Sequence, residues 1–394
     1  MKLTVSKLFL EFFNSEKAGG FILIGCTLIS LMLANSAAGE GYLHFWHQKA
    51  GFEQAGIALN HPVEFWINDG LMTLFFLLVG LEIERELYIG ELSTLKQALL
   101  PVFAAIGGML APALIHFVFN TDSGTQSGFG IPMATDIAFA LGILSLLGNK
   151  VPATLKIFLT AFAIIDDLGA ILMIAIFYTK SFSLLYFGLA MGIWGILLLM
   201  NRLKVHSLVS YIIPGIALWY CMLQSGVHAT ISGILLAFAL PFGNGDETTC
   251  SYRLQHLLHK PVAFIVMPVF ALANTGIVFP DKWVAELSSR NSLGIILGLI
   301  VGKPVVILLF SYTAVKLKIS QLAVDVKWSY IFGASLLGGI GFTMSIFITL
   351  LAFDDSNTVS NSKIAVLVSS LLAGIAGYLI LKYSIKTKNN TEAE

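Results

Sequence analysis

Two adjacent carboxylic acids lie in the middle of an apolar stretch of the chain. Asp166 and Asp167 interrupt residues 159–175, about midway between the flanking charges Lys156 and Lys180. Adjacent helix positions point about 100° apart, so both side chains can line one cavity. A charged side chain at the centre of a bilayer costs about 2.5–3.5 kcal/mol and usually has a transport function. A salt-bridged packing pair, or a loop at this position, is the alternative interpretation.

A lysine occupies a similar position in another apolar stretch. Lys303 is thirteen residues from both Arg290 and Lys316, the charges that bracket its stretch. An unpaired ammonium is unstable in lipid, so Lys303 is expected to pair with one of the buried aspartates. The lysine can serve either as a structural counter-ion or as a participant in transport.

Two apolar stretches contain residues that interrupt a helix. Asp136 follows Pro132, which lacks a backbone donor, and Gly338, Gly339 and Gly341 lie near the centre of a later stretch. Unwound backbone at membrane depth is tolerated only around a protein-lined cavity. Interruptions at corresponding positions of two halves are typical of the binding site of a secondary transporter.

The composition places these residues in a membrane protein. Of 394 residues, 57% are hydrophobic and only 12% are charged, against about 25% charged in soluble domains. This balance excludes a soluble enzyme, a secreted disulfide scaffold and a disordered chain. The net charge of zero provides no basic surface for nucleic acid. The three cysteines have no metal-binding or disulfide spacing.

About twelve apolar runs are long enough to cross a bilayer as helices, which predicts an all-α polytopic fold. They fall near residues 18–35, 63–82, 98–119, 127–147, 155–179, 182–200, 207–223, 226–241, 257–279, 292–315, 328–353 and 362–381. Lysine and arginine are concentrated in the connecting segments on one side, which predicts that both termini are cytoplasmic.

The interrupted runs are the fourth and the eleventh spans. Spans 3–5 (residues 98–179) and spans 10–12 (residues 292–381) are therefore predicted to be two repeats within a single transporter domain over residues 1–394. Because each repeat has an odd number of spans, their topology is expected to be inverted, with the two broken helices crossing near the midplane.

The side chains at this crossing favour a proton or a small hard cation. Carboxylates, the Thr135 hydroxyl and freed carbonyls are oxygen ligands, and no Cys or His lies beside them to select a softer metal. A carboxylate binds Na⁺ only when it is deprotonated, so protons and cations compete for the same atoms. No cofactor is expected.

Six segments together closely resemble the NhaA-type bacterial sodium/proton antiporters, over nearly the whole chain. They are residues 66–72 (WINDGLM), 132–142 (PMATDIAFALG), 163–169 (AIIDDLG), 225–230 (SGVHAT), 302–304 (GKP) and 338–346 (GGIGFTMSI). The resemblance implies export of Na⁺ or Li⁺ in exchange for inward H⁺ by alternating access. Exchange in this family is electrogenic and is activated at alkaline pH.

The resemblance also implies roles for individual residues. Asp166 and Asp167 would bind the cation (Na⁺ or Li⁺) or protons, with Thr135 and Asp136 assisting and Lys303 pairing with Asp166. Asp69, in the first matching segment, is a further candidate.

A group of residues at the ends of spans 2 and 9 resembles the region through which this family responds to pH. The residues are Glu82, Arg85, Glu86, Gln255, His256 and Lys260, with His228 as an ambiguous addition that can equally be a packed, hydrogen-bonded histidine. Two of this chain's residues depart from the pattern: Gln255 replaces a usual acid and Glu84 a common lysine, so a shifted pH profile is expected. A solvated helix end is the alternative interpretation of this group.

The family forms homodimers in the bacterial inner membrane, in contact with lipid and partly through an outer loop that corresponds to residues 42–60. A proton- or sodium-coupled symporter of a small solute is the alternative function. An enzyme is not expected, because Ser225 and His228 lack the GxSG pattern of an intramembrane serine protease and the two adjacent acids lie on one helix. A passive cation channel would be obstructed by Lys303.

Overall fold

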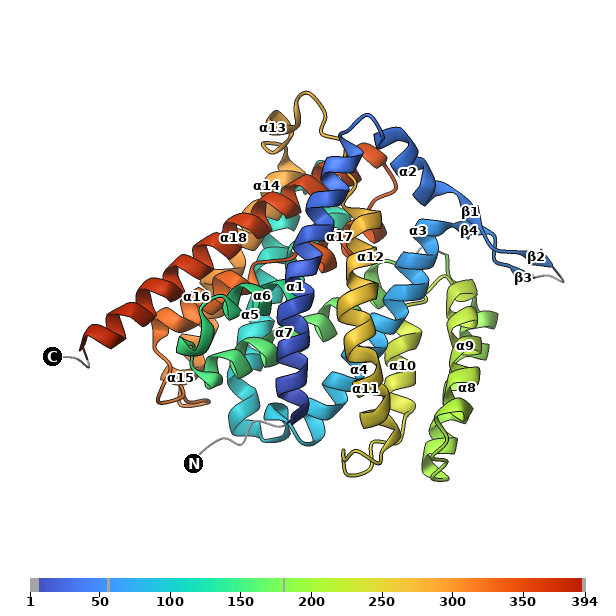
Figure 1. Cartoon of the computed structure of the whole chain (residues 1–394), viewed down its shortest axis with the longest axis horizontal. Helices are drawn as coiled ribbons and strands as arrows, with labels where there is room; N and C mark the ends of the chain where they lie inside the picture. Colours follow the sequence, from blue (N-terminus) through green and yellow to red (C-terminus); the bar gives the residue numbers. More distant parts are fainter. Residues whose placement is uncertain (1–6, 55–56, 180, 392–394) are drawn as a thin grey trace. The chain divides into compact units, whose positions relative to one another are not determined.

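The computed structural model of the chain describes residues 7–54, 57–179 and 181–391, and these are mostly helical (Figure 1). They divide into two compact units. Unit 1 contains the described residues up to Ser15, together with Ile22–Arg85 and Ile174–Phe279. Unit 2 contains Glu16–Phe21, Glu86–Met173 and the described residues from Pro280 onward.

Unit 2 contains nearly all of both predicted repeats. Its main helices are α5 (Leu95–Phe119), η3 (Gln126–Met133), α6 (Ile137–Ser145), α7 (Ala153–Phe177, whose last residues belong to unit 1), α14 (Arg290–Leu297), η6 (Gly298–Gly302), α15 (Lys303–Lys316), α16 (Trp328–Gly338), α17 (Phe342–Ala352) and α18 (Ser356–Thr391). Three short turns, η2 (Glu91–Ser93), η4 (Gly148–Lys150) and α13 (Trp283–Glu286), connect them. A helix, a broken helix and a second helix thus follow one another twice, as predicted for spans 3–5 and 10–12.

The two breaks arise from the residues that the sequence singles out. The 3₁₀ helix η3 contains Pro132 and ends at Met133, and the backbone is extended at Ala134 and Asp136. The Asp136 carboxylate then accepts the Phe139 N–H at 2.9 Å and so starts α6. In the second series α16 and α17 are bent by 42° at their break. The predicted broken helices in spans 4 and 11 are therefore confirmed.

Unit 1 contains the remaining long helices and a small antiparallel ribbon. The helices are α1 (Lys7–Ala34, of which Glu16–Phe21 belong to unit 2), α2 (Gly39–His47), α3 (Val63–Phe65), η1 (Trp66–Leu71), α4 (Met72–Tyr88, whose end from Glu86 belongs to unit 2), α8 (Leu184–Arg202), α9 (Leu208–Ser225), α10 (Ile231–Ala239), α11 (Cys250–Pro261), η5 (Val262–Val266) and α12 (Met267–Asn274). In the ribbon, β1 (Lys49–Ala50) pairs with β4 (His61–Pro62) and β2 (Glu53–Gln54) pairs with β3 (Ile57–Ala58). Residues 55 and 56 of the predicted outer loop lie outside the described residues.

The number of spanning helices is close to the prediction. In the described part of the chain, nine helices are long and apolar enough to cross a membrane, and two bent pairs bring the total to as many as eleven. The predicted span 226–241 corresponds to α10, whose helix has only nine residues. A helix of that length is shorter than the hydrocarbon core, because each residue rises only about 1.5 Å.

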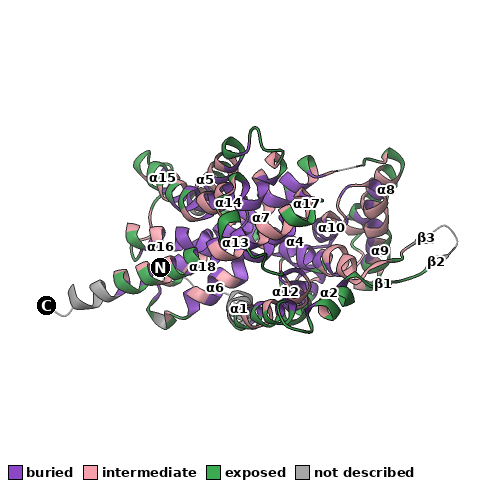
Figure 2. Cartoon of the chain, turned by 90° about the horizontal axis from the view of Figure 1, so that it is seen from above, coloured by how far each residue is buried: buried purple, intermediate pink, exposed green. Residues whose placement is uncertain are grey.

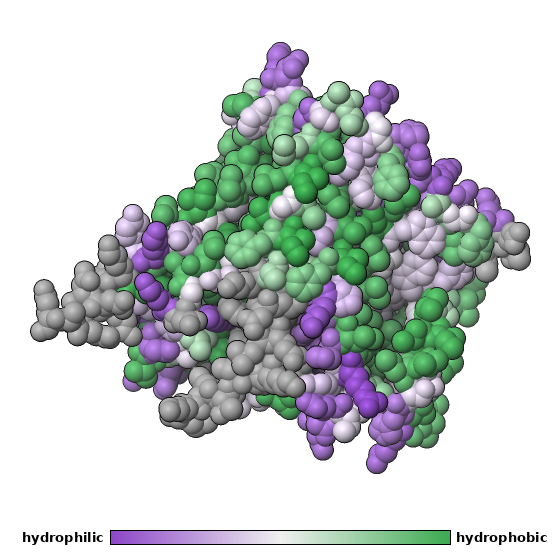
Figure 3. Space-filling view, in the orientation of Figure 1, coloured by the Kyte–Doolittle hydropathy of each residue, from purple (hydrophilic) through white to green (hydrophobic). Residues whose placement is uncertain are grey.

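Burial separates the helices that hold polar groups from those that present apolar faces outward. In unit 2 most of α17 is buried, including Thr343 and Ser345 (Figure 2). In unit 1, α8 and α9 expose large apolar side chains such as Leu184 and Ile213 (Figure 3). Exposed apolar faces of this extent are expected where lipid is the solvent.

The close packing at the second break gives a test of this architecture. A Cβ on Gly339 would overlap the Leu299 carbonyl oxygen, so Gly339→Ala should destabilise the purified protein by about 1–3 kcal/mol, as overpacking does. The measurement is the thermal unfolding midpoint in detergent. Gly188→Ala, in an open part of α8, is the matched control and should leave the midpoint unchanged or raised. An unchanged midpoint for Gly339→Ala would contradict the packing at this break.

Candidate functional site

Both acids predicted to bind ions are buried on α7. Asp166 is 0% exposed and Asp167 is 2% exposed. Small residues on the same helix, Ala163 and Ala170, are also fully buried and allow other helices to approach closely. The carboxylates are therefore held within unit 2.

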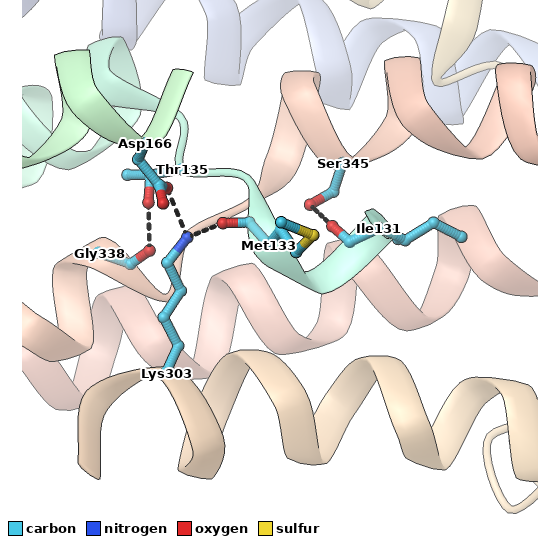
Figure 4. Close-up of polar contacts among 7 residues, drawn as sticks. All are labelled: Ile131, Met133, Thr135, Asp166, Lys303, Gly338 and Ser345. Carbon is cyan, nitrogen blue, oxygen red and sulfur yellow. Dashed lines mark hydrogen bonds and ion pairs between the residues drawn. The ribbon is translucent and has the colours of Figure 1, made fainter. Parts of the chain in front are cut away.

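Lys303 pairs with the first of these acids. Its ammonium Nζ is 2.7 Å from Asp166 Oδ2, and it also donates a hydrogen bond to the Met133 carbonyl oxygen (Figure 4). The Phe162 ring lies 5.9 Å from the ammonium. Both partners of the ion pair are 0% exposed. The pairing expected of Lys303 is thus present, and the carbonyl of the broken helix is a second acceptor.

Asp136 has a different environment from Asp166. Besides capping α6, its carboxylate accepts the Thr343 N–H at 3.1 Å and the Thr343 hydroxyl. It therefore lies at the N-termini of both α6 and α17, where helix dipoles stabilise a negative charge. These hydrogen bonds satisfy the carboxylate within the protein.

The two broken stretches are joined by further hydrogen bonds. Asp136 N–H donates to the Ile340 carbonyl at 2.6 Å. Thr135 donates to the Gly338 carbonyl at 2.7 Å, and Ser345 donates to the Ile131 carbonyl at 2.6 Å (Figure 4). The freed backbone groups of each stretch are thus paired with the other stretch.

The second carboxylate oxygen of Asp166, Oδ1, is not the one bonded to Lys303. This oxygen is buried. The Thr135 side chain lies beside the carboxylate (Figure 4), and Asp167 is the next residue of the helix. A carboxylate oxygen in this setting can bind a proton or a small cation. Among the described residues, no three His, Cys, Asp or Glu side chains gather as they would around a tightly held metal.

The residues predicted to respond to pH are divided between two faces of α11. Gln255 is buried, whereas His256 and Lys260 are exposed, and His256 stacks on Tyr252. The buried histidine is instead His259, whose Nε2 is 3.1 Å from Glu82 Oε1 on α4.

Glu84, which stands where the family pattern commonly has a lysine, lies at the same contact between α4 and α11. Glu84 is buried and accepts a hydrogen bond from Ser251 at 3.3 Å. Arg85 and Glu86 continue α4. The structure therefore brings Glu82 and Glu84 together with one face of α11.

Asp69 and His228 lie in unit 1, outside the cluster around Asp166. Asp69 belongs to the π-helical turn η1, and its carbonyl accepts hydrogen bonds from Thr73 and from the Trp219 indole. The His228 ring is bonded to the Tyr178 carbonyl at 3.0 Å. This contact favours the packed role that the sequence leaves open for His228.

Sequence reasoning missed three groups of the site. The Met133 carbonyl as an acceptor for Lys303, and the Ile340 carbonyl as an acceptor for Asp136, carry no signal in residue type. His259 does have a signal: Ser251, Gln255 and His259 are spaced by four residues and share a helix face, while His256 and Lys260 lie on another.

Crossed broken helices with a buried carboxylate and a buried lysine define a secondary transporter of small ions. Comparison with known proteins identifies the kind of transporter. The family model for Na⁺/H⁺ antiporter 1 matches residues 10–381, and the chain belongs to this family.

The chain is similar to named relatives over nearly their full lengths. The chain is 59% identical to a Na⁺/H⁺ antiporter NhaA of Flavobacterium psychrophilum over 98% of both chains. It is 55% identical to a Na⁺/H⁺ antiporter NhaA of Cytophaga hutchinsonii over 99% of both. It is 45% identical to that of Yersinia enterocolitica over 96% of this chain and 98% of the relative. These relatives are transporters, and the family membership supports Na⁺/H⁺ exchange.

The ion pair predicts a characteristic pattern of stability. Lys303→Met leaves the Asp166 carboxylate buried without its counter-ion and should cost about 3–5 kcal/mol. Adding Asp166→Asn to this variant removes the uncompensated charge, so part of the loss should be recovered. Unfolding midpoints of the wild type, both single variants and the double variant in detergent test this coupling. Additive effects of the two substitutions would show that the pair is not formed.

Proposed function

We propose that the chain exports Na⁺ or Li⁺ in exchange for inward H⁺, with the two ions competing for Asp166 and Asp167. The observation that carries this proposal is the fully buried Asp166 carboxylate, which is paired with Lys303 through one oxygen and lies beside the Thr135 side chain. A cation binds the carboxylates only after they lose their protons. One site therefore carries either ion but not both.

The exchange is proposed to be electrogenic and to proceed by alternating access. More than one proton must then enter for each Na⁺, and Asp166, Asp167 and Lys303 together offer enough titratable groups. The broken helices are the elements that would change the side from which these carboxylates are reached. Thr135 and Asp136 assist by holding the crossing in place.

We propose that alkaline activation arises at the contact between α4 and α11. At this contact His259 Nε2 of α11 lies 3.1 Å from Glu82 Oε1 of α4, and both side chains are buried. The other polar side chains at this contact are Ser251 and Gln255, on the same face of α11, and Glu84 on α4. Arg85, Glu86, His256 and Lys260 remain further candidates for this response.

The chain is proposed to form a homodimer in the bacterial inner membrane, with both termini cytoplasmic and lipid around the helices. The ribbon of β1 to β4, which begins within the proposed dimer loop (residues 42–60) and ends at Pro62, supports this arrangement. Two-stranded ribbons expose unpaired backbone groups at their edges, and these can pair with a second copy.

Reconstituted protein tests the proposed exchange. Proteoliposomes with an imposed pH gradient should lose it on addition of Na⁺ or Li⁺ between about pH 7 and 9, where ionised carboxylates are available. Asp167→Asn should abolish this response, because an amide cannot exchange a proton for a cation. Asp246→Asn is the matched control: Asp246 is an exposed loop residue whose pKa is lowered by hydrogen bonds from Thr248. Exchange by Asp167→Asn at the wild-type rate would exclude that carboxylate from the mechanism.

The pH dependence of exchange tests the proposed sensor. His259→Gln removes the imidazole that faces Glu82, so the pH profile of exchange should move relative to that of the wild type. Gln255→Glu should also move the pH of half-maximal activity, since it adds an acid to the same face. Initial rates from pH 6 to 9 provide the measurement. A profile that moves with His256→Gln but not with His259→Gln would place the response on the exposed face of α11 instead.

A further inference from the structure

The helix that carries Lys303 contains one widened turn immediately before this residue. The Lys303 backbone N–H donates to the Gly298 carbonyl, five residues back, instead of to the residue four back as in an α-helix. The widened turn is η6, and it lies between the regular helices α14 and α15. Single π turns hold one more residue than an α turn and occur frequently at functional sites.

Pro304 explains the position of this turn. In a regular helix residue 304 would donate to the Ile300 carbonyl, but proline has no N–H and its ring collides with that carbonyl. A wider turn before the proline relieves the collision. The same combination occurs in unit 1, where η5 is followed by Pro268 and the Met267 N–H donates to the Val262 carbonyl. A wide turn followed by proline thus occurs twice, and in one of these two copies the residue between them is a lysine; η1 is a wide turn without a following proline.

Close contacts fix the wide turn against its neighbours. A Cβ on Gly298 would lie 2.8 Å from Pro132 Cβ in η3, and a Cβ on Gly302 would overlap the Ile115 side chain of α5. Pro132 directly precedes Met133, whose carbonyl accepts from Lys303. The wide turn is thus packed against the same stretch of backbone that helps to hold the ammonium.

We propose that Pro304 is a positioning residue for ion exchange, acting through the wide turn Gly298–Gly302 to hold Lys303 on Asp166. This inference rests on the proposed function for the meaning of the ion pair. If the turn became α-helical without a change in length, Lys303 would rotate by about 100° and shift by about 1.5 Å relative to residues before the turn. Its ammonium would then leave Asp166, and a cation would meet less competition for that carboxylate.

The test is the affinity for Na⁺, measured through stabilisation of the purified full-length protein. Na⁺ raises the unfolding midpoint according to its dissociation constant, and choline chloride controls for ionic strength. Pro304→Ala should tighten Na⁺ binding about fivefold or more, at the lower end of typical coupling between linked equilibria. Pro268→Ala, at the matching turn without a lysine, should leave the affinity unchanged. Equal affinities for Pro304→Ala and the wild type would overturn the proposal.

Two further variants separate positioning from a general effect on structure. In a Lys303→Gln background, Pro304→Ala should have no additional effect on Na⁺ affinity, because the group that it positions is gone. Deletion of Val301 together with Pro304→Ala removes the extra residue of the turn and permits a regular helix in the original register. This double variant should return to the wild-type affinity, which also covers the case in which Pro304→Ala alone folds poorly. Equal effects of Pro304→Ala with and without Lys303, or no recovery in a folded double variant, would contradict the proposal.

The failure of this inference can be distinguished from failure of the proposed function. Absence of Na⁺-dependent exchange and of Na⁺-dependent stabilisation in the wild type would reject the proposed function. A wild type that binds and exchanges Na⁺, with Pro304→Ala indistinguishable from it, would reject only the role of Pro304.

Discussion

Every backbone amide and carbonyl in lipid needs a partner inside the protein, and this constraint governs the crossing of the two broken helices. Each stretch supplies what the other lacks: Thr135 binds the Gly338 carbonyl, Ser345 binds the Ile131 carbonyl, and the Asp136 N–H binds the Ile340 carbonyl. Neither stretch could remain unwound alone at an acceptable cost. The two breaks therefore form one structure, although about 200 residues separate them in the chain.

The buried charges at this crossing are stabilised by different groups. At about 2.5–3.5 kcal/mol each, four charges in mid-span represent about 10–14 kcal/mol that the fold must offset. Asp136 is offset by the N-termini of α6 and α17 and by Thr343, so its charge is used in holding the helices. Asp166 is offset by Lys303, which bonds one of its carboxylate oxygens at 2.7 Å. On the proposed function, this difference in hydrogen bonding separates an acid that holds the helices from one that exchanges ions.

The sequence predicts the parts of this arrangement that depend on residue type. Charges in apolar runs identify Asp166, Asp167 and Lys303, and Pro132 with the glycines at 338–341 identifies both breaks. Partners provided by the backbone, such as the Met133 carbonyl, are not predictable, since every residue has a carbonyl and only the fold selects one. The wide turn before Lys303 has a sequence cause in Pro304, but a proline inside a helix can equally produce a kink. On α11 a family pattern pointed to His256, while helical periodicity points to His259, because burial follows the helix face.

Lys303 connects the carboxylate to the crossing, and this connection bears on how ion exchange could drive a conformational change. If Asp166 binds a proton or a cation, its negative charge no longer balances the ammonium. The Met133 carbonyl, the Phe162 ring and the nearby Asp167 carboxylate then remain around it, and loss of the paired counter-ion from a buried charge is destabilising. The charge on Asp166 therefore affects the electrostatic energy of α15, which carries the lysine, and of the end of η3, which carries the carbonyl. An ion on the carboxylate thus acts on the two elements whose packing holds the broken helices together.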